Sequence, residues 1–462
     1  MKTITIYTTC IAACLCLAAC HKYLDVTPKG IVIPSTTAQY EGILNSPTLT
    51  QTFQPELMTM SDDCYYVTDT TTSTILTNAY LWRPYINAED QNSPAVWGNL
   101  YTAIYFTNVV INRVMDASDN ATQARKQQLL GEALVIRAYC YMDLLTVFAK
   151  SYNASTAATD PGMPLVTSTD VGDKTPPRSS LQATLDSMIS QTKLAAGYLP
   201  TTNINKYRVT SYAAYGLLSR IYLYMADYAN AKKYAEMALA APHALVNYNN
   251  YTAATAAAGF PNASASPEVL WQRTSSNYTI PFQVLYSPEL KNIYDSSIAY
   301  SSHPDLRYRY LSVATNPGLS RNNPNGTYAN FGITFPELDL TRAEIMARTN
   351  DAAGAMAIVN TLRKARIVTA QYADLTAATA DQALTIVLAE RRRELAFAGL
   401  RWFDMKRLDQ DGRMPKVLRA NLATSTTPYV RLDSLMPHSP KYTFQVPIRV
   451  QQFNPGMTLN AR

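Results

Sequence analysis

The chain has 462 residues, of which 47% are hydrophobic and 16% charged, a composition that is ordinary for a globular protein and excludes wholesale disorder. Its formal net charge of +6 is mild, and Lys and Arg are scattered beside Asp and Glu, which argues against a nucleic-acid-binding protein. A chain of this length exceeds what one small core needs, so we expect two or three structural units.

The chain begins with the pattern of an export signal. Lys2 precedes an uncharged apolar run that ends in Leu-Ala-Ala just before Cys20. The run is shorter than the ~20 residues of a membrane-spanning helix, and no later run approaches that length. We therefore favour a signal peptide over residues 1–19 rather than a transmembrane anchor. A cut before cysteine resembles the bacterial lipoprotein signal rather than an ordinary secretory one, which predicts a mature chain of residues 20–462 held on a membrane by acyl chains on Cys20.

Two cysteines remain after cleavage. Cys10, Cys14 and Cys16 leave with the signal peptide, so Cys64 and Cys140 are the ones within the folded part. An oxidising compartment allows one disulfide between them. Two buried free thiols fit their Tyr-rich apolar surroundings equally well, and the sequence leaves both possibilities open.

Helical periodicity dominates the chain in blocks. Apolar side chains recur at steps of three and four residues, which is typical of helices with one buried face. The periodic segments predict helical hairpins at about 97–149, 181–241 and 338–408, the last ending in a long helix over about 379–408. Residues 151–180 are rich in Ser, Thr, Asp and Pro and are expected to form a long loop.

One segment carries a repeat signal. In SRIYLYMADYANAKKYAEMALAAP (219–242), Tyr222, Ala226, Ala231 and Ala238 fall close to the tetratricopeptide spacing. Small residues in such units let two antiparallel helices approach each other closely. The sequence therefore predicts a mainly α protein with a tetratricopeptide-like helical-repeat scaffold.

The residue composition changes between these helical blocks, and the helical periodicity is lost. Residues 50–95, 242–335 and 409–462 hold Pro, Asn, Ser, Gly and Tyr in irregular order, and we expect them to form a loop-rich lobe with a few short strands. Loops this long in a compact protein are usually functional. The chain has 32 Tyr against 11 Phe and 4 Trp, and Tyr suits both packing seams and stacking platforms for ligands.

The sequence offers no recognisable catalytic motif. The four histidines stand isolated, with no spacing suited to zinc, and no nucleophile elbow, Walker A loop or dinucleotide fingerprint is present. The pair Asp62-Asp63 fits a surface turn or an Asx cap better than a catalytic pair, although carboxylates from different loops can converge. We predict no catalytic residue, metal or cofactor.

The segment 390–408, ERRRELAFAGLRWFDMKRL, is dense in Arg and Glu beside aromatic residues. It fits either a solvated charged face or a partly buried ion-pair network. It resembles the C-terminal signature of the SusD/RagB family of surface lipoproteins from Bacteroidetes-type nutrient uptake systems. Further stretches follow the pattern of that family in order across the mature chain: 21–30 (HKYLDVTPKG), 32–45, 97–108, 137–149, the repeat-like block, 335–348, 360–366 and 444–457.

The resemblance implies a SusD-like helical scaffold on one side and an irregular loop lobe on the other. It implies a non-catalytic role, in which an oligosaccharide, or in some cases a peptide, is captured and passed to a TonB-dependent (SusC-like) outer-membrane transporter. The expected location is the outer membrane, lipid-anchored and exposed at the cell surface. The alternatives from other classes are a surface-anchored hydrolase and a helical-repeat scaffold that binds proteins.

Ligand contacts in this family lie in variable loops, so candidate residues come from chemistry alone. Sugar rings stack on aromatic faces, and charged or amide groups bind the hydroxyls. Trp82, Trp97 and Trp402 are expected to be core residues. The candidates, each expected to be at least partly exposed, are Asp63, Tyr65, Tyr66, Arg83, Tyr278, Tyr286 and Tyr294.

Overall fold

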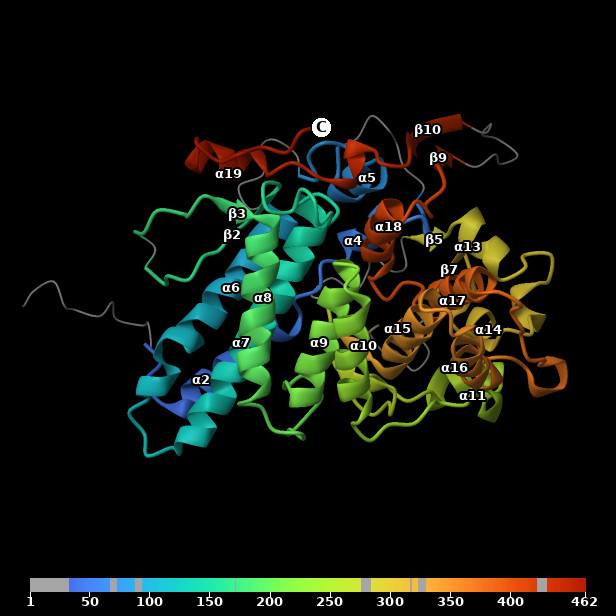
Figure 1. The fold of residues 1–462 in the computed structure, drawn as a ribbon, viewed down its shortest axis with the longest axis horizontal. Helices are drawn as coiled ribbons and strands as arrows, with labels where there is room; N and C mark the ends of the chain where they lie inside the picture. Colours follow the sequence, from blue (N-terminus) through green and yellow to red (C-terminus); the bar gives the residue numbers. More distant parts are fainter. Residues whose placement is uncertain are drawn as a thin grey trace, which may run out of the picture.

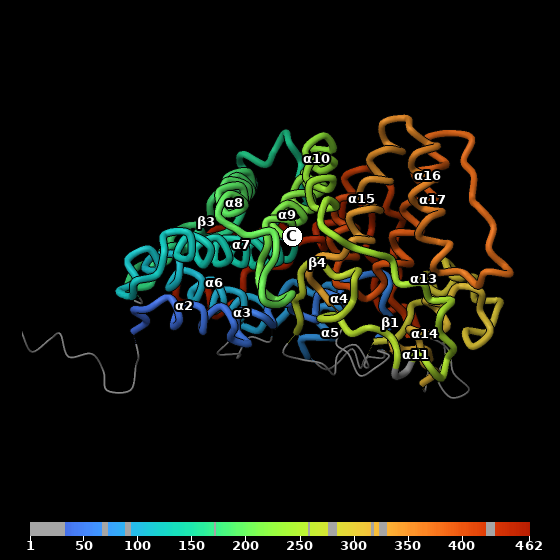
Figure 2. The backbone as a smooth tube through the Cα atoms, turned by 90° about the horizontal axis from the view of Figure 1, so that it is seen from below, coloured from blue at the N-terminus to red at the C-terminus, as the bar shows by residue number. Residues whose placement is uncertain are grey.

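The structure is a computed structural model. It describes residues 33–66, 73–87, 94–170, 172–275, 284–315, 318–322, 330–421 and 430–462. Long helices stack side by side across the molecule from the teal end to the orange end of the chain (Figure 1). Seen at 90°, these helices occupy one side, and short helices, strands and loops occupy the other (Figure 2). The predicted mainly α architecture, with a helical scaffold and an irregular lobe, is confirmed.

Each helix of the scaffold packs on the next one along the chain, so that antiparallel hairpins follow one another. The scaffold consists of α6 (Ala95–Arg113), α7 (Gln123–Phe148), α8 (Leu181–Ala196), α9 (Ser211–Tyr224), α10 (Tyr228–Leu239), α15 (Phe335–Arg348), α16 (Ala352–Lys364) and α17 (Ala380–Glu394).

The repeat-like segment forms the hairpin of α9 and α10. Ala231 and Ala238 are fully buried, and this lets α10 approach α9 closely enough for the Ser219 hydroxyl to donate to the Ala231 carbonyl at 2.9 Å. The rings of Tyr222 and Tyr234 stack across the hairpin at 5.6 Å. These are the small-residue and tyrosine roles that the spacing predicts.

Polar side chains fix where most scaffold helices begin. An N-cap oxygen accepts a hydrogen bond from a backbone N–H of the first turn, which stabilises a helix by about 1 kcal/mol. The capping residues are Thr122 (α7), Ser180 (α8), Thr210 (α9), Asp227 (α10), Thr334 (α15), Asp351 (α16) and Thr379 (α17).

The irregular lobe is built from short elements. A four-stranded antiparallel sheet has the order β1 (Cys64–Tyr65), β5 (Leu285–Tyr286), β7 (Leu319–Arg321), β6 (Ser312–Ala314). Antiparallel pairs are formed by β4 (Val269–Trp271) with β8 (Ile333–Thr334), β9 (Val417–Asn421) with β10 (Val430–Leu435), and β2 (Pro161–Pro164) with β3 (Arg178–Ser180). The last pair lies within 151–180, which the sequence predicts to be loop alone.

Short helices complete the lobe and the N-terminal edge of the scaffold. They are α2 (Thr37–Leu44), α3 (Pro47–Thr50), α4 (Glu56–Met60), α5 (Ile75–Tyr80), α11 (Ala253–Gly259), α13 (Pro288–Ile293), α14 (Leu306–Tyr310), α18 (Arg401–Gln410) and α19 (Ile448–Phe453). Single 3-10 turns are η1 (Val114–Asp116), η2 (Tyr248–Asn250), η3 (Tyr300–Ser302), η5 (Thr369–Gln371) and η6 (Pro440–Tyr442).

The prediction of a single helix over about 379–408 is wrong, because two helices, α17 and α18, occupy this stretch. The helical path breaks between α17 and α18, where Phe397 and Gly399 have φ of 62° and 79°. A Cβ at Gly399 would clash with the ring of Phe53, so this glycine provides both the left-handed backbone and the space for that ring. Helical periodicity continues on both sides of the break, which is why it does not reveal the break.

One hydrophobic core joins the scaffold to the lobe, and Trp82, Trp97 and Trp402 belong to it as predicted. Cys64 and Cys140 are buried free thiols rather than a disulfide. Burial raises the pKa of the Cys64 thiol to about 12, so it remains protonated. Within the described segments, no helix combines the length and apolar character needed to cross a bilayer.

Replacing the glycine at the helix break tests its conformation. Gly399→Ala is expected to destabilise the protein by more than the ~1 kcal/mol cost of a left-handed alanine, because Phe53 must also move. Gly412→Ala is the matched control, since Gly412 has φ of 68° but a Cβ there would meet no atom within 4 Å beyond its chain neighbours. Urea unfolding of both variants measures the difference, and equal losses of unfolding free energy would contradict the packing argument.

Candidate functional site

The Asp62-Asp63 pair is structural. Both carboxylates are buried, Asp63 with 1% of its surface exposed. Asp63 pairs with Arg392 at 2.6 Å, and Asp62 accepts two hydrogen bonds from Arg401 at 2.6 and 2.9 Å. Burial raises the pKa of Asp62, but the two guanidinium groups outweigh it and hold this pKa well below its usual value. The prediction that Asp63 is at least partly exposed is wrong, because Arg392 of α17 and Arg401 of α18 pack against its carboxylate.

The rest of the signature segment forms a buried ion-pair network, as one of the two sequence interpretations predicts. Asp404 accepts hydrogen bonds from Arg391 at 2.9 Å and Arg407 at 2.7 Å, and Arg407 also pairs with Glu344 of α15. Burial raises the pKa of Asp404, yet Arg391 and Arg407 outweigh it and lower this pKa to about 2. The network therefore ties α15, α17 and α18 together.

Three of the candidate tyrosines are also buried. Tyr65, Tyr286 and Tyr294 are 6%, 2% and 3% exposed, so their expected exposure is wrong. Tyr65 and Tyr286 lie in the paired strands β1 and β5. Tyr286 packs on Phe397 at the helix break, and the Tyr294 hydroxyl donates to the Arg393 carbonyl at 2.7 Å. Tyr286 and Tyr294 thus pack the lobe against the C-terminal end of α17 and the break that follows it.

Two of the remaining candidates, Tyr66 and Arg83, lie in the described part of the lobe. Tyr66 is half-buried against Tyr80, with ring centroids 6.0 Å apart, and Arg83 is half-buried with a 3.0 Å hydrogen bond to Asn78. Both are partly exposed, as a ligand contact requires, and both remain predictions. Tyr278 lies outside the described residues, as does Cys20, the residue predicted to carry the lipid anchor.

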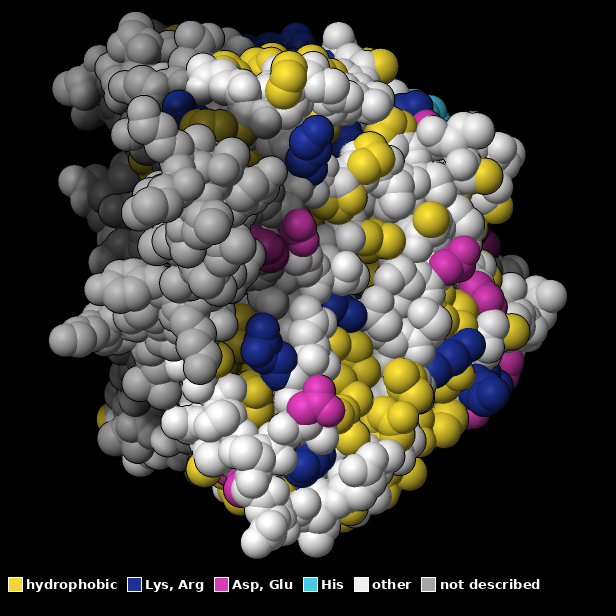
Figure 3. All heavy atoms as spheres, turned by 90° about the vertical axis from the view of Figure 1, so that its left-hand side faces the viewer, with side chains coloured by type: hydrophobic (Ala, Val, Ile, Leu, Met, Phe, Trp, Pro, Cys, Tyr) yellow, Lys and Arg dark blue, Asp and Glu magenta, His cyan; other side chains and the backbone are white. Residues whose placement is uncertain are grey.

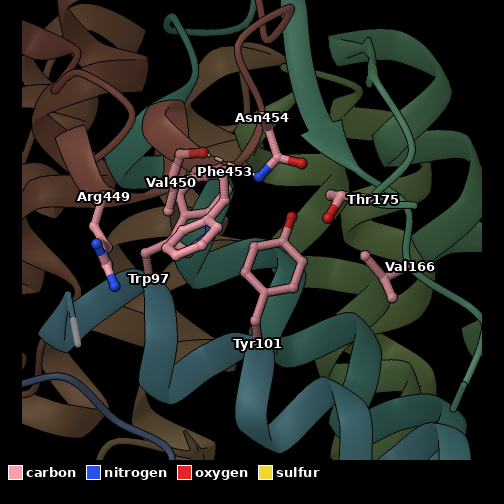
Figure 4. A pocket seen from close by; sticks show the side chains of 8 residues that line it. All are labelled: Trp97, Tyr101, Val166, Thr175, Arg449, Val450, Phe453 and Asn454. Carbon is pink, nitrogen blue, oxygen red and sulfur yellow. Dashed lines mark hydrogen bonds between the residues drawn. The ribbon is translucent and has the colours of Figure 1, made fainter. Parts of the chain in front are cut away.

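A groove lined by residues outside the sequence-based candidates runs between α6, α19 and the segment that joins β2 to β3. The end of the molecule that carries α19 faces the viewer in Figure 3, with Lys and Arg side chains among apolar ones in its upper part. The groove contains a pocket of about 380 Å³ and, next to it, a larger hollow of about 770 Å³ that we call the chamber. Thr175, Phe453 and Asn454 line both. We call this groove the aromatic groove; its pocket is lined by Trp97, Tyr101, Val166, Thr175, Arg449, Val450, Phe453 and Asn454 (Figure 4). The chamber is lined by residues 172–177 and 453–457.

Helix α6 supplies the floor of the aromatic groove. Trp97 and Tyr101 are one helical turn apart, so they share a face, and their ring centroids are 5.0 Å apart. Trp97 packs edge-on against Phe148 of α7, and Tyr101 packs in the same way against Tyr141. The Tyr101 hydroxyl also donates to the Pro164 carbonyl at 2.9 Å, which holds the β2–β3 segment beside the floor.

One arginine fixes the opposite wall. Arg178 donates to the carbonyls of Gly162 and Phe148 at 2.7 and 2.9 Å, and to Thr458 and Asn460 of the C-terminal segment at 3.1 and 2.9 Å. Burial lowers the pKa of Arg178 to about 10, still far above neutral pH, so the group stays charged. The segment that carries α19 is thereby held against α7 and the β2–β3 pair.

The aromatic groove combines one strongly exposed ring, that of Phe453, with converging polar groups. Phe453 is 69% exposed, and the Tyr101 hydroxyl, the Asn454 amide and the Thr175 hydroxyl point toward a common space (Figure 4). The Asn454 amide nitrogen donates to the Val450 carbonyl at 3.0 Å, which fixes the direction of its oxygen. Burial raises the pKa of Tyr101 well above its usual value, so the hydroxyl remains a neutral hydrogen-bonding group.

Sequence reasoning misses this groove for a physical reason. Trp97 is a core residue, as predicted, with 6% of its surface exposed, and only the fold shows that this remainder faces a groove. Arg449, Phe453 and Asn454 lie in a stretch that carries a family pattern but no chemical motif. The sequence signal that could have indicated them is the aromatic pair Trp97 and Tyr101. Two large rings one helical turn apart on the same face of a helix must pack against another segment of the chain.

Two observations on the described residues concern metal and carboxylate chemistry. No group of three His, Cys, Asp or Glu side chains there could hold a metal ion. Asp62 and Asp63, the adjacent carboxylates that the sequence analysis compared with a catalytic pair, are both buried in ion pairs with arginines.

Two family models match the chain. Residues 22–223 match a SusD-like model described as starch-binding and associating with the outer membrane, and residues 308–461 match the SusD family. These matches define a protein of the outer-membrane nutrient-binding class. The chain belongs to the SusD/RagB family. No curated protein matches it.

Solved structures share the fold over nearly the whole chain. A putative sugar-binding protein from Bacteroides vulgatus has a TM-score of 0.73 at 22% identity and covers 93% of this chain and 99% of its own. A SusD superfamily protein from Bacteroides thetaiotaomicron has a TM-score of 0.74 at 18% identity, with 92% and 100% covered. A laminarin-binding SusD-like protein has a TM-score of 0.62 at 16% identity, with 92% and 99% covered.

Acid titration tests the buried network. Asp404 has a pKa lowered from 3.8 to about 2, so its contribution to stability is complete above pH 5 and is lost as the pH falls through 4 toward 2. The difference in unfolding free energy between the wild type and Asp404→Asn is expected to shrink by about 1 kcal/mol between pH 6 and pH 3.

Urea unfolding across this pH range measures that difference. Asp381→Asn is the control, because the Asp381 side chain is 74% exposed and pairs only at the surface with Arg413. Its difference from the wild type should stay small at every pH. A difference for Asp404→Asn that does not change with pH would show that the network does not hold this carboxylate ionised.

Proposed function

We propose that the protein is a non-catalytic glycan-binding lipoprotein of the outer membrane, which captures oligosaccharides and delivers them to a TonB-dependent transporter. The observation that carries the proposal is membership of a family whose matching model is described as starch-binding. The laminarin-binding protein with the same fold supports glycan over other ligands.

The aromatic groove is the described surface that fits such a ligand best. A sugar ring has an apolar face of C–H groups and an edge of hydroxyls. Phe453 and the exposed part of Trp97 offer apolar faces, while Asn454, Thr175 and Tyr101 offer hydrogen-bonding groups around the same space. The pocket and the chamber together offer space for more than one sugar ring, and the small number of polar groups around them favours the modest affinity that a hand-over to a transporter needs.

A binding assay tests the site and the absence of catalysis together. Phe453→Ala is expected to weaken oligosaccharide binding about tenfold, because the stacking face is lost. Isothermal titration calorimetry against a panel of oligosaccharides, including β-glucans, gives the affinities. Chromatography of the same mixtures should show the glycans uncleaved.

The matched control is Ile204→Ala, which removes another strongly exposed apolar side chain (72%) away from the groove. It should leave the affinity unchanged. Equal affinities of Phe453→Ala and the wild type would place the site elsewhere. A ladder of products would support the hydrolase alternative, and binding of peptides alone would replace the glycan by a peptide.

The anchor and the partner can be tested in one experiment. The Leu-Ala-Ala-Cys pattern that ends at Cys20 assigns membrane attachment to lipid on this cysteine, and inward transport of a bound glycan then needs a separate channel. Affinity-tagged wild-type protein, extracted in mild detergent from cells grown on the inducing glycan, is expected to co-purify with an outer-membrane barrel. Cys20→Ala should be lost from the membrane fraction. Tight membrane association of a processed Cys20→Ala protein would contradict the anchor, and recovery of the wild type alone would contradict the transporter.

A further inference from the structure

Arg449 differs from the arginines of the signature segment 390–408, which are bound to carboxylates. Arg391, Arg392 and Arg401 each pair with a carboxylate within 3 Å. Among the described residues, Arg449 has no ion pair; its polar contact is a 3.3 Å hydrogen bond from Nη1 to the Gln452 side-chain oxygen. A half-buried guanidinium with most of its five donors unused is a ready binding group for an anion.

The position of Arg449 is fixed by the groove itself. Its guanidinium carbon lies 4.4 Å from the centroid of the Phe453 ring, and this cation–π contact restrains the side chain. Arg449 lies at the Trp97 end of the pocket, on the side away from Thr175 and Val166 (Figure 4). It can therefore reach a substituent of a sugar ring that stacks on the aromatic floor.

A second cation lies along the same groove. Lys174 is exposed and lines the chamber beyond Phe453. The neighbouring carboxylate, Asp173, already accepts a hydrogen bond from the Ser168 hydroxyl at 2.5 Å. The described lining of the aromatic groove thus carries two cations, Arg449 and Lys174, and one carboxylate, Asp173, so its net charge is positive and favours an anionic chain.

We infer that the aromatic groove selects acidic oligosaccharides, which are chains that contain uronic acids, and that Arg449 binds the uronate carboxylate. The inference rests on the proposed glycan-binding function and names its substrate class. A planar guanidinium matches a carboxylate in a two-point hydrogen bond, and the carboxylate of a uronic acid is attached to a ring whose apolar face can stack on Phe453. Arg449 is then the residue that distinguishes acidic from neutral sugars.

Calorimetry with a matched pair of ligands tests this directly. Oligomers of galacturonate, glucuronate and mannuronate are compared with their methyl esters, which keep the sugar ring and remove the charge. For at least one of them, the wild type is expected to bind the free acid at least tenfold more tightly than the ester, with a preference that falls as salt is added. Arg449→Gln should lose this preference while it still binds the ester.

Two controls separate charge from folding. Arg431→Gln removes an exposed arginine whose side chain bonds Ser434 in β10, away from the groove, and should keep the preference. The thermal unfolding of Arg449→Gln should match that of the wild type, because the hydrogen bond and the ring contact of Arg449 are both local, to Gln452 and Phe453 of α19.

The outcomes distinguish this inference from the proposed function. Neutral glycans that bind in a Phe453-dependent manner, with no preference for the acid, would overturn the inference and leave glycan binding intact. A preference that survives in Arg449→Gln, or binding of sulfated glycans or acidic peptides in place of uronates, would also overturn it. Failure of the wild type to bind any glycan would overturn both.

Discussion

The pairing of buried arginines with carboxylates around the break between α17 and α18 is the interaction on which the rest of the structure depends. Arg392 and Arg401 hold Asp62 and Asp63 of the lobe. Each buried charge would cost several kcal/mol alone, so removal of one partner is far more damaging than the net value of the pair. The network specifies how the lobe and scaffold fit together more than it adds to stability.

The same segment supports the aromatic groove at a distance. The Trp402 indole and the Lys406 side-chain nitrogen both donate to the Thr146 carbonyl, at 3.1 and 3.0 Å, near the C-terminal end of α7. These donors satisfy carbonyls that a helix end leaves without intrahelical partners. Phe148, in that last turn of α7, is the ring on which Trp97 rests. The family signature and the groove are therefore linked through the end of one helix.

The sequence predicts the regular parts of this fold well and the irregular parts poorly. Periodicity locates α6, α7 and the α9–α10 hairpin because each buries one face. It does not show the break between α17 and α18, where Gly399 leaves space for the ring of Phe53, a residue far away in the chain. Nor does it show the aromatic groove, whose sides come from α6, the β2–β3 segment and α19.

The abundance of tyrosine has a structural explanation that a search for ligand contacts overlooks. Several buried tyrosines donate their hydroxyl to a backbone carbonyl outside regular structure: Tyr40 to Pro34, Tyr139 to Phe331, Tyr286 to Leu311 and Tyr310 to Tyr251. An irregular lobe has few ladder partners for its carbonyls, and a tyrosine fills the core and satisfies one of them at once. This role buries the rings that the sequence suggested for stacking.

The attachment of the α19 segment by Arg178 has a consequence for how the protein folds. Arg178 and Thr458 are 280 residues apart, so closing this contact costs much more chain entropy than forming any helical hairpin of the scaffold. Local hairpins therefore form first, and the wall of the aromatic groove is added late. A partly folded chain that has already formed its helical repeats still lacks the groove. Ligand binding therefore cannot stabilise this intermediate before the two distant segments are in contact.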